Sequence, residues 1–311
     1  MLQVPFVKRW VRWLLAIVGI ALLLVLIAYV VVADQAADDL LRPRNPSEPN
    51  TEIPSEVDQQ FRVRRPDGVE IDAWIYDADA PKPPGAVDTV LVLHGISDQK
   101  RTMDVLGRRF SRHGVRAVLA DLRGHGLSSE TIISFGVLER EDLVAVLDAA
   151  AEHVGGLGEI GVYGPSYGGA VAIQLAGIDP RVRRVVTVAS FSSMQEIVGP
   201  LVHSSWGTWG ELIPSPVTNL MVVRAGARGG FDPDSASPAA LVADAEARFL
   251  VVHSRQDDVV PYEHALSIVD NCEGRCELMT LEDKDHLGSL SNVELRRALH
   301  RFLVGEEWTG G

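Results

Sequence analysis

Three scarcities in the sequence limit what this protein can be. Only two cysteines occur among 311 residues, Cys272 and Cys276, and without a second Cys/His pair they argue against a zinc site. The 29 lysines and arginines are outnumbered by 42 aspartates and glutamates, which gives a net charge of −13 at pH 7. Because no Lys/Arg cluster lies beyond the extreme N-terminus to bind a phosphate backbone, we expect no nucleic-acid partner.

Charged residues are missing altogether from residues 13–33. As a helix rising about 1.5 Å per residue, this stretch spans the hydrocarbon core of a bilayer, so we expect a transmembrane anchor. The charges on its two sides are Lys8, Arg9 and Arg12 and then Asp34, Asp38 and Asp39. The positive-inside tendency therefore puts residues 1–12 in the cytoplasm and the rest of the chain outside it. The alternative is a cleaved signal peptide ending near Ala33, although the apolar core is longer than the usual stretch of about 7–15 residues.

The cysteine pair bears on the same question of compartment. Cys272 and Cys276 flank Gly274 in the stretch Asn-Cys-Glu-Gly-Arg-Cys-Glu. An extracytoplasmic location permits a short disulfide there, and two unlinked thiols are the alternative. The sequence leaves both open.

Hydrophobic residues make up 46% of the chain, which is enough for one large domain with appendages. Residues 34–60 hold four prolines among acidic and polar side chains, so we expect a flexible linker that does not fold alone. A periodic pattern occupies residues 61–305, and residues 306–311 form a C-terminal tail.

The periodic part begins with a hairpin around Pro66-Asp67-Gly68 and then alternates short apolar runs with amphipathic stretches. Strands are expected at 89–93, 116–120, 160–163, 185–189, 249–252 and 277–281, and helices at 100–112, 138–153, 167–176, 261–270 and 292–303. This alternation is typical of an α/β fold with a mostly parallel central sheet and helices on both faces. Residues 191–245, with scattered prolines, break the rhythm and are expected to form a cap insertion.

The segment around Ser166 has the pattern of a nucleophile elbow. The strand Ile160-Gly-Val-Tyr runs into Gly164-x-Ser166-x-Gly168 and then into a helix. A serine there occupies a tight, strained turn at the carboxyl end of the sheet, where a Cβ on either glycine would collide with the crossing chain. A dinucleotide fingerprint is excluded, because Gly-x-Gly-x-x-Gly does not occur in this segment.

A nucleophilic serine needs a histidine base and an acid that fixes the tautomer of that base. The order along the chain in folds with this elbow is serine, acid, histidine. Asp257 and Asp258 follow one apolar strand, and His286 comes soon after the last strand. These groups all fall at strand ends, as the chemistry requires.

The oxyanion formed during attack must be met by backbone N–H groups. We expect one from Tyr167, the residue after the nucleophile, and one from Ile96, in the early loop where Gly95 lets the chain turn. His94 in that loop, and the stretch from Asp121 to Gly126, are expected to shape loops rather than to react.

The ordered set Leu-His-Gly, Asp-x-Arg-Gly-His-Gly, Gly-x-Ser-x-Gly-Gly, Asp-Asp-Val-Val-Pro and Asp-His resembles the α/β-hydrolase superfamily, particularly its serine-aminopeptidase-like and BEM46-like branch, over about residues 61–305. The resemblance implies the α/β-hydrolase fold and a serine hydrolase activity, and it implies no metal or organic cofactor. It also selects Asp257 as the acid. Two departures stand out: Ser254, where many relatives have glycine, and Pro165 directly before the nucleophile.

We therefore expect a membrane-anchored serine hydrolase that cleaves an ester, thioester or amide bond of a small-molecule or lipid-like acyl substrate through Ser166. An acyltransferase would use the same triad, and a membrane-tethered binding or scaffold protein would keep the fold without turnover. Trp206 and Trp209 in the cap either line an acyl pocket or, as we expect, pack the cap on its own domain.

Overall fold

The computed structural model describes residues 5–43, 51–282, 285, 286, 288 and 293–305. Its centre is a sheet whose eight described strands have the order β1-β2-β4-β3-β5-β6-β7-β8. The strands are β1 (Gln59–Arg64), β2 (Glu70–Tyr76), β3 (Thr89–Val92), β4 (Arg116–Ala120), β5 (Ile160–Pro165), β6 (Val182–Val188), β7 (Arg248–Ser254) and β8 (Cys276–Leu281). β2 pairs antiparallel with both β1 and β4, and the remaining pairs are parallel.

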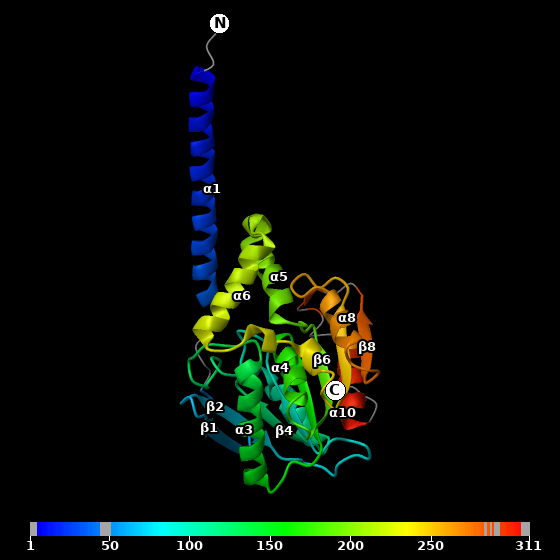
Figure 1. Cartoon of the computed structure of the whole chain (residues 1–311). Helices are drawn as coiled ribbons and strands as arrows, with labels where there is room; N and C mark the ends of the chain where they lie inside the picture. Colours follow the sequence, from blue (N-terminus) through cyan, green and yellow to red (C-terminus); the bar gives the residue numbers. More distant parts are fainter. Residues whose placement is uncertain (1–4, 44–50, 283–284, 287, 289–292, 306–311) are drawn as a thin grey trace.

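Helices cover both faces of this sheet (Figure 1). They are α2 (Asp104–Arg112), α3 (Val137–Val154), α4 (Tyr167–Ala176), α8 (Glu263–Asp270) and α10 (Val293–Val304). The alternation of side chains along β3 builds the two layers, because Leu91 packs in the layer of α3 and α4 while Val90 and Val92 pack with Phe110 of α2 and with α10. The expected mostly parallel α/β sheet is confirmed.

The expected strands and helices match the structure apart from their ends. β6 begins three residues before the expected start, and residues 100–103 form a 3-10 turn, η1 (Lys100–Met103), ahead of α2. The last helix was expected from position 292, which lies outside the described residues, as do residues 306–311 of the expected tail.

The cap lies between β6 and β7, where the insertion was expected. It consists of α5 (Met194–Trp206), η2 (Gly207–Leu212), α6 (Ser215–Gly229), η3 (Pro233–Ser235) and α7 (Pro238–Leu241). α5 and α6 form a hairpin that projects from the body, and η2 is its tip (Figure 1).

The first helix, α1 (Pro5–Leu40), is longer than the expected anchor. The expectation of a flexible linker over 34–60 is therefore wrong at its start. Ala33, Ala36 and Ala37 are buried at helical spacing, and α1 packs along α6 there. Arg228 of α6 adds an ion pair, 2.7 Å from the carboxylate of Asp34. The physical reason is that α6 packs against these alanines. The sequence pattern does not show which part of the chain will cover them.

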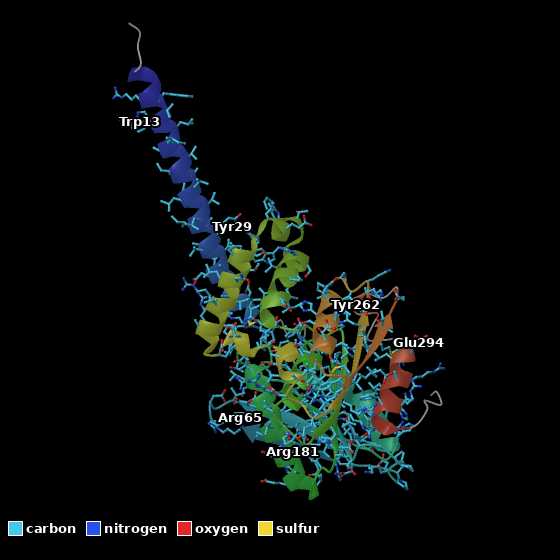
Figure 2. All side chains as sticks on the ribbon, turned by 45° about the vertical axis from the view of Figure 1, so that its right-hand side comes forward. Trp13, Tyr29, Arg65, Arg181, Tyr262 and Glu294 are labelled. Atoms are coloured by element: carbon cyan, nitrogen blue, oxygen red, sulfur yellow. A yellow bond between two sulfur atoms is a disulfide. The ribbon has the colours of Figure 1, made fainter. Side chains whose placement is uncertain are left out.

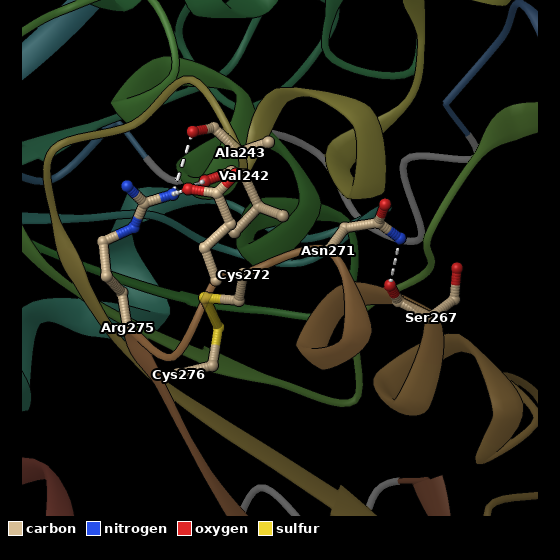
Figure 3. Close-up of a disulfide and its surroundings, with 8 residues drawn as sticks. Val242, Ala243, Ser267, Asn271, Cys272, Arg275 and Cys276 are labelled. Atoms are coloured by element: carbon tan, nitrogen blue, oxygen red, sulfur yellow. Dashed lines mark hydrogen bonds and ion pairs between the residues drawn. A yellow bond between two sulfur atoms is a disulfide. The ribbon is translucent and has the colours of Figure 1, made fainter.

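Cys272 and Cys276 are joined by a disulfide in the turn between α8 and β8, with their Cα atoms 5.7 Å apart (Figure 3). In the same turn Arg275 donates hydrogen bonds to the carbonyls of Val242 and Ala243, at 3.2 and 2.8 Å. The disulfide closes the turn on itself, and Arg275 holds it against the segment that follows α7.

Candidate active site

Ser166 occupies a strained turn between β5 and α4. Its backbone has φ 49° and ψ −116°, a region that L-residues rarely adopt. The glycines around it permit the crossing: a Cβ on Gly164 would lie 2.3 Å from the carbonyl oxygen of Gly168, and one on Gly168 would lie 2.3 Å from that of His94. The turn is held by the Ser166 N–H, which donates to the Val188 carbonyl at 2.7 Å. The local sequence thus fixes the hydroxyl at the carboxyl end of the parallel strands.

The structure brings Ser166, His286 and Asp257 together from three separate loops. His286 Nε2 lies 3.1 Å from Ser166 Oγ, and His286 Nδ1 lies 2.8 and 3.1 Å from the two carboxylate oxygens of Asp257. These are hydrogen-bonding distances, so a proton can move from the hydroxyl to the ring while the carboxylate holds the other ring nitrogen. The arrangement is chemically that of an activated nucleophile.

Asp257 is held as an anion in a buried place. Burial by itself raises the pKa of its carboxyl, but hydrogen bonds from His286 and from the amides of Val260 and Val259 outweigh this and lower the pKa below its usual value. The two amides donate to Oδ1 at 2.8 and 3.0 Å. A carboxylate that is charged and fixed in this way keeps the Nδ1 proton on His286 and stabilises the imidazolium.

The neighbouring acid, Asp258, is placed differently. Among the described residues, its Oδ1 accepts a long hydrogen bond, at 3.4 Å, from the backbone N–H of His286 and none from the His286 ring. The geometry therefore distinguishes Asp257, which contacts the His286 ring, from Asp258, which contacts the His286 backbone.

A second histidine, His253, lies beside Asp257 and was not singled out from the sequence. Its Nε2 is 3.6 Å from Asp257 Oδ2 and donates to the carbonyl of Val260 at 2.8 Å. Burial lowers the pKa of His253, so the ring is neutral at pH 7. Its only sequence signal is its place at the end of the strand before Asp257. It supports the turn on which the acid is carried.

Ile96 and Tyr167 carry the two backbone amides that the sequence predicts for an oxyanion hole. Both residues line the same cavity as Ser166 and His286. Tyr167 is the first residue of α4, so its N–H has no acceptor within the helix. Among the described residues neither amide donates to another backbone or side-chain group.

His94 fixes the loop that carries Ile96. Its Nδ1 donates to the Gly95 carbonyl at 2.7 Å, and its Nε2 accepts from the Leu122 N–H at 3.0 Å. Because a peptide unit is planar and trans, a Gly95 carbonyl turned toward the His94 ring points the Ile96 N–H the opposite way. Burial lowers the pKa of His94, which keeps the ring neutral and in this tautomer. His94 therefore has the structural place in the loop that the sequence predicts.

The stretch from Asp121 to Gly126 also serves the loop rather than the reaction. Asp121 accepts from the buried Lys100 ammonium and from the Leu127 amide, and Lys100 lies 2.7 Å from Asp72 as well. Arg123 donates to both carboxylate oxygens of Asp142. These buried charges pair with one another, and none of them lines the cavity at Ser166.

A cavity of about 380 Å³ opens at Ser166 and His286. Its walls are mostly apolar, with Phe135, Phe191, Ile197 and Leu201 among the residues that line it. Such a volume and lining suit the acyl part of a small substrate. Among the residues that the structure describes, no group of three or more His, Cys, Asp or Glu is arranged to hold a metal ion.

The two cap tryptophans lie outside this cavity. Trp209 is 75% exposed at the cap tip, so the expectation that it packs the cap on its own domain is wrong. Trp206 is partly buried, packs against the core and lines a neighbouring cavity.

A family model described as serine aminopeptidase, S33, matches residues 85–238, which include the elbow and the oxyanion loop. The chain has the α/β-hydrolase fold. It is also similar to the uncharacterized protein YqkD of Bacillus subtilis (strain 168), with 25% identity over 227 residues, 70% of this chain and 71% of that protein.

Solved structures of α/β-hydrolases share the fold. The Pyrococcus furiosus esterase Pf2001 superposes with a TM-score of 0.64 at 18% identity, covering 86% of this chain and all of the esterase. The 2,6-dihydroxy-pseudo-oxynicotine hydrolase gives 0.58 at 19% identity, covering 80% and 69%. A Mycobacterium tuberculosis puromycin-hydrolyzing peptidase gives 0.58 at 17% identity, covering 81% and 40%. At these identities the likeness shows the fold alone.

This α/β-hydrolase fold accommodates both departures from the superfamily pattern. Pro165 ends β5 and pairs in register with Val188 of β6. Ser254 continues β7, is fully buried, and its Oγ accepts from the Gln256 N–H at 3.2 Å. Neither residue disturbs the loop that carries Asp257.

Proposed function

We propose that this chain is a membrane-anchored serine hydrolase that cleaves an ester, thioester or amide acyl bond through an acyl-enzyme on Ser166. The observation that carries the proposal is the unbroken chain of hydrogen bonds from the Ser166 hydroxyl through His286 to Asp257, at 3.1 and 2.8 Å. It stands beside an apolar cavity lined by Ile96 and Tyr167, whose amides have no acceptor in the part of the chain that the structure describes.

The first half of the reaction forms the acyl-enzyme. As Ser166 Oγ attacks the carbonyl carbon, its proton passes to His286 Nε2. The carbonyl oxygen becomes an oxyanion and accepts hydrogen bonds from the Ile96 and Tyr167 amides. The intermediate collapses, the bond to the leaving group breaks, and His286 returns the proton to the departing alcohol, thiol or amine.

The second half releases the acid. A water molecule gives a proton to His286 Nε2 and attacks the acyl carbon, and the same two amides meet the second oxyanion. Collapse breaks the bond to Ser166 Oγ, which takes back the proton. Asp257 remains ionised throughout, and no other reactant is needed.

Three observations support the membrane anchor. The segment Arg9–Leu40 of α1 is long and apolar enough to cross a bilayer, and its most apolar window is wholly unburied. Its C-terminal end packs into the cap, an arrangement that favours a retained helix over a cleaved signal peptide. The disulfide and the flanking charges favour an extracytoplasmic catalytic domain.

A fluorophosphonate probe tests the nucleophile directly. We expect it to label the full chain, solubilised in detergent, at Ser166, and we expect Ser166→Ala to abolish both labelling and hydrolysis of acyl esters of graded length. A folded wild-type protein that neither reacts with the probe nor turns over any ester would favour a binding or scaffold role. Formation of a new ester between the acyl group and an added acceptor alcohol, instead of the free acid, would indicate an acyltransferase.

The orientation has its own test. Protease added outside intact cells, once any outer barrier is opened, is expected to digest the catalytic domain. Full protection of that domain would overturn the orientation.

A further inference from the structure

A second cavity of about 210 Å³ lies between α1 and the cap. Ala36 and Leu40 line it from α1, Val202 and Trp206 from α5, and Met221 from α6. The helix that carries the apolar anchor thus forms one wall of a cavity in the catalytic domain. A tether that merely held the domain near the membrane would have no need of this wall.

The second cavity adjoins the cavity at Ser166. Ile96, Phe135 and Leu201 line both of them. All three side chains are apolar, so an alkyl chain that extends from one cavity into the other meets hydrocarbon at the junction. The charged residues of the second cavity are Asp39, in the last turn of α1, and Arg42, two residues after the end of α1.

The cap tip lies beside the part of α1 that is expected in the membrane. The Tyr29 hydroxyl donates to the Leu212 carbonyl at the tip, at 3.4 Å. Figure 2 shows Tyr29 level with the cap hairpin and Trp13 far beyond it along α1. Tyr29 is four residues before the end of the charge-free run, roughly 6 Å along the helix axis. If α1 spans a bilayer, the tip therefore reaches the depth of about 5–10 Å at which interfacial apolar groups insert.

The side chains at this tip suit such a depth. Trp209 is 75% exposed and Leu212 is 62% exposed. Both belong to η2 at the tip of the α5–α6 hairpin, which projects on the side of the body from which α1 leaves (Figure 1). The tip also carries the exposed Thr208 and Glu211, so it is amphipathic, and the interface of the bilayer in which α1 lies suits both its apolar and its polar side chains.

We infer that the second cavity, between α1 and the cap, is a port through which the acyl chain of a bilayer-resident substrate passes from the lipid to Ser166. The inference rests on the proposed function and adds the substrate class: an amphiphile with a long acyl chain, taken up sideways from the outer leaflet. A lipid that crosses water first must expose its acyl chain to water, at a free-energy cost that grows with every CH₂. A port walled by α1 removes that exposure, because the chain moves from one apolar environment to another.

Blocking the port is the first test. Ser205 is exposed on α5 and lines the second cavity, whereas its neighbour Ser204 is exposed and lines neither cavity. The full chain is reconstituted in phosphatidylcholine vesicles and assayed with a hexadecanoyl ester carried in the bilayer and with a soluble butanoyl ester. We expect Ser205→Trp to lower the ratio of long-chain to short-chain kcat/KM at least tenfold, and Ser204→Trp to leave both rates unchanged.

The outcomes separate the port from the proposed function. If wild type cleaves neither ester, the proposed function fails. If wild type cleaves both and Ser205→Trp leaves the ratio unchanged, the port is overturned while the hydrolase stands. A long-chain ester that is cleaved equally well from detergent-free solution and from the bilayer also overturns lateral entry.

The depth of the cap tip is the second test. Both native cysteines are disulfide-bonded, so a single introduced cysteine can carry a fluorophore. In vesicles with brominated acyl chains, a label at Trp209→Cys should be quenched. A label at Glu152→Cys, exposed near the C-terminal end of α3 at the opposite edge of the sheet, should keep its emission. Equal emission from the two sites would overturn the insertion of the tip and with it the port.

Discussion

The carboxylate of Asp257 lies 2.8 Å from Nδ1 of His286, although the two residues are 29 positions apart and belong to different loops. Both loops follow strands that are neighbours in the sheet, β7 and β8, which pair in parallel. Because parallel strands end at the same edge, the loops after them meet there. The pairing of these two side chains is therefore a consequence of strand order.

Asp257→Asn is expected to lower kcat by on the order of 10³–10⁴, because an amide does not hold the Nδ1 proton or stabilise the imidazolium. Asp258→Asn is expected to cost less than tenfold, since Asp258 meets the backbone N–H of His286 and not its ring. Steady-state hydrolysis of a chromogenic ester by each purified variant measures both effects, with thermal unfolding as the check on folding. Equal losses in the two variants would contradict the assignment.

His94 is expected to act as a positioning residue for the oxyanion hole. His94→Phe removes the donor to the Gly95 carbonyl, so we expect kcat to fall about 10- to 100-fold with KM changed less than threefold, somewhat below the effect of losing a whole oxyanion donor. His94→Asn, which can still donate to that carbonyl, should recover part of the loss. A fall in the free energy of unfolding without a change in kcat would show that His94 only stabilises the loop.

The stability of the protein is expected to fall in mild acid. Burial, with a smaller contribution from the nearby His94, lowers the pKa of His125 to about 4. The unfolded chain takes up this proton below about pH 6.5 while the folded state does so only near pH 4, so stability is full above pH 6.5 and is lost as the pH falls through this window. His125 alone should contribute about 2 kcal/mol of loss between pH 7 and pH 5.

Urea unfolding at these two pH values measures that loss. His125→Asn keeps a donor for the Arg123 carbonyl but does not titrate, so its stability should depend on pH less steeply by this amount. An identical slope in wild type and variant would show that the imidazole at position 125 is not held neutral.

The disulfide is expected to stabilise the domain without serving the reaction. It closes a short loop around Gly274, for which chain entropy gives on the order of 2 kcal/mol. A thiol reductant should lower the free energy of unfolding of wild type by this amount. The reductant should not change the free energy of unfolding of the double variant that carries Cys272→Ser and Cys276→Ser. Wild type and the double variant should hydrolyse an ester at the same rate at 25 °C. A reductant that affects both proteins equally would mean that the bridge is absent.

Much of the central fold could be predicted because its signals are local. Gly164, Ser166 and Gly168 specify a strand, a strained turn and a helix within a few residues, and α4 has the bounds that the sequence predicts. Apolar runs of strand length recur between amphipathic stretches, so the parallel sheet could be expected as well. Helix starts were less predictable, since η1 precedes α2 where Lys100 turns inward to its buried carboxylates.

The supporting residues of the site could not be predicted from the sequence. His253 beside Asp257, and Phe135 in the wall of the cavity, have no local signature that distinguishes them from other core residues. Their roles arise from which loops meet, and that depends on pairing between strands far apart in the chain.

The sequence by itself determined the elbow, the order of serine, acid and histidine, and the long apolar helix, because each depends on residues close together or on composition. Only the tertiary structure decided that Ala33, Ala36 and Ala37 lie against α6 and that the anchor helix walls a cavity next to the one at Ser166. The physical reason is that a stripe of small residues packs against whichever surface fits it. That surface exists only once the cap has folded.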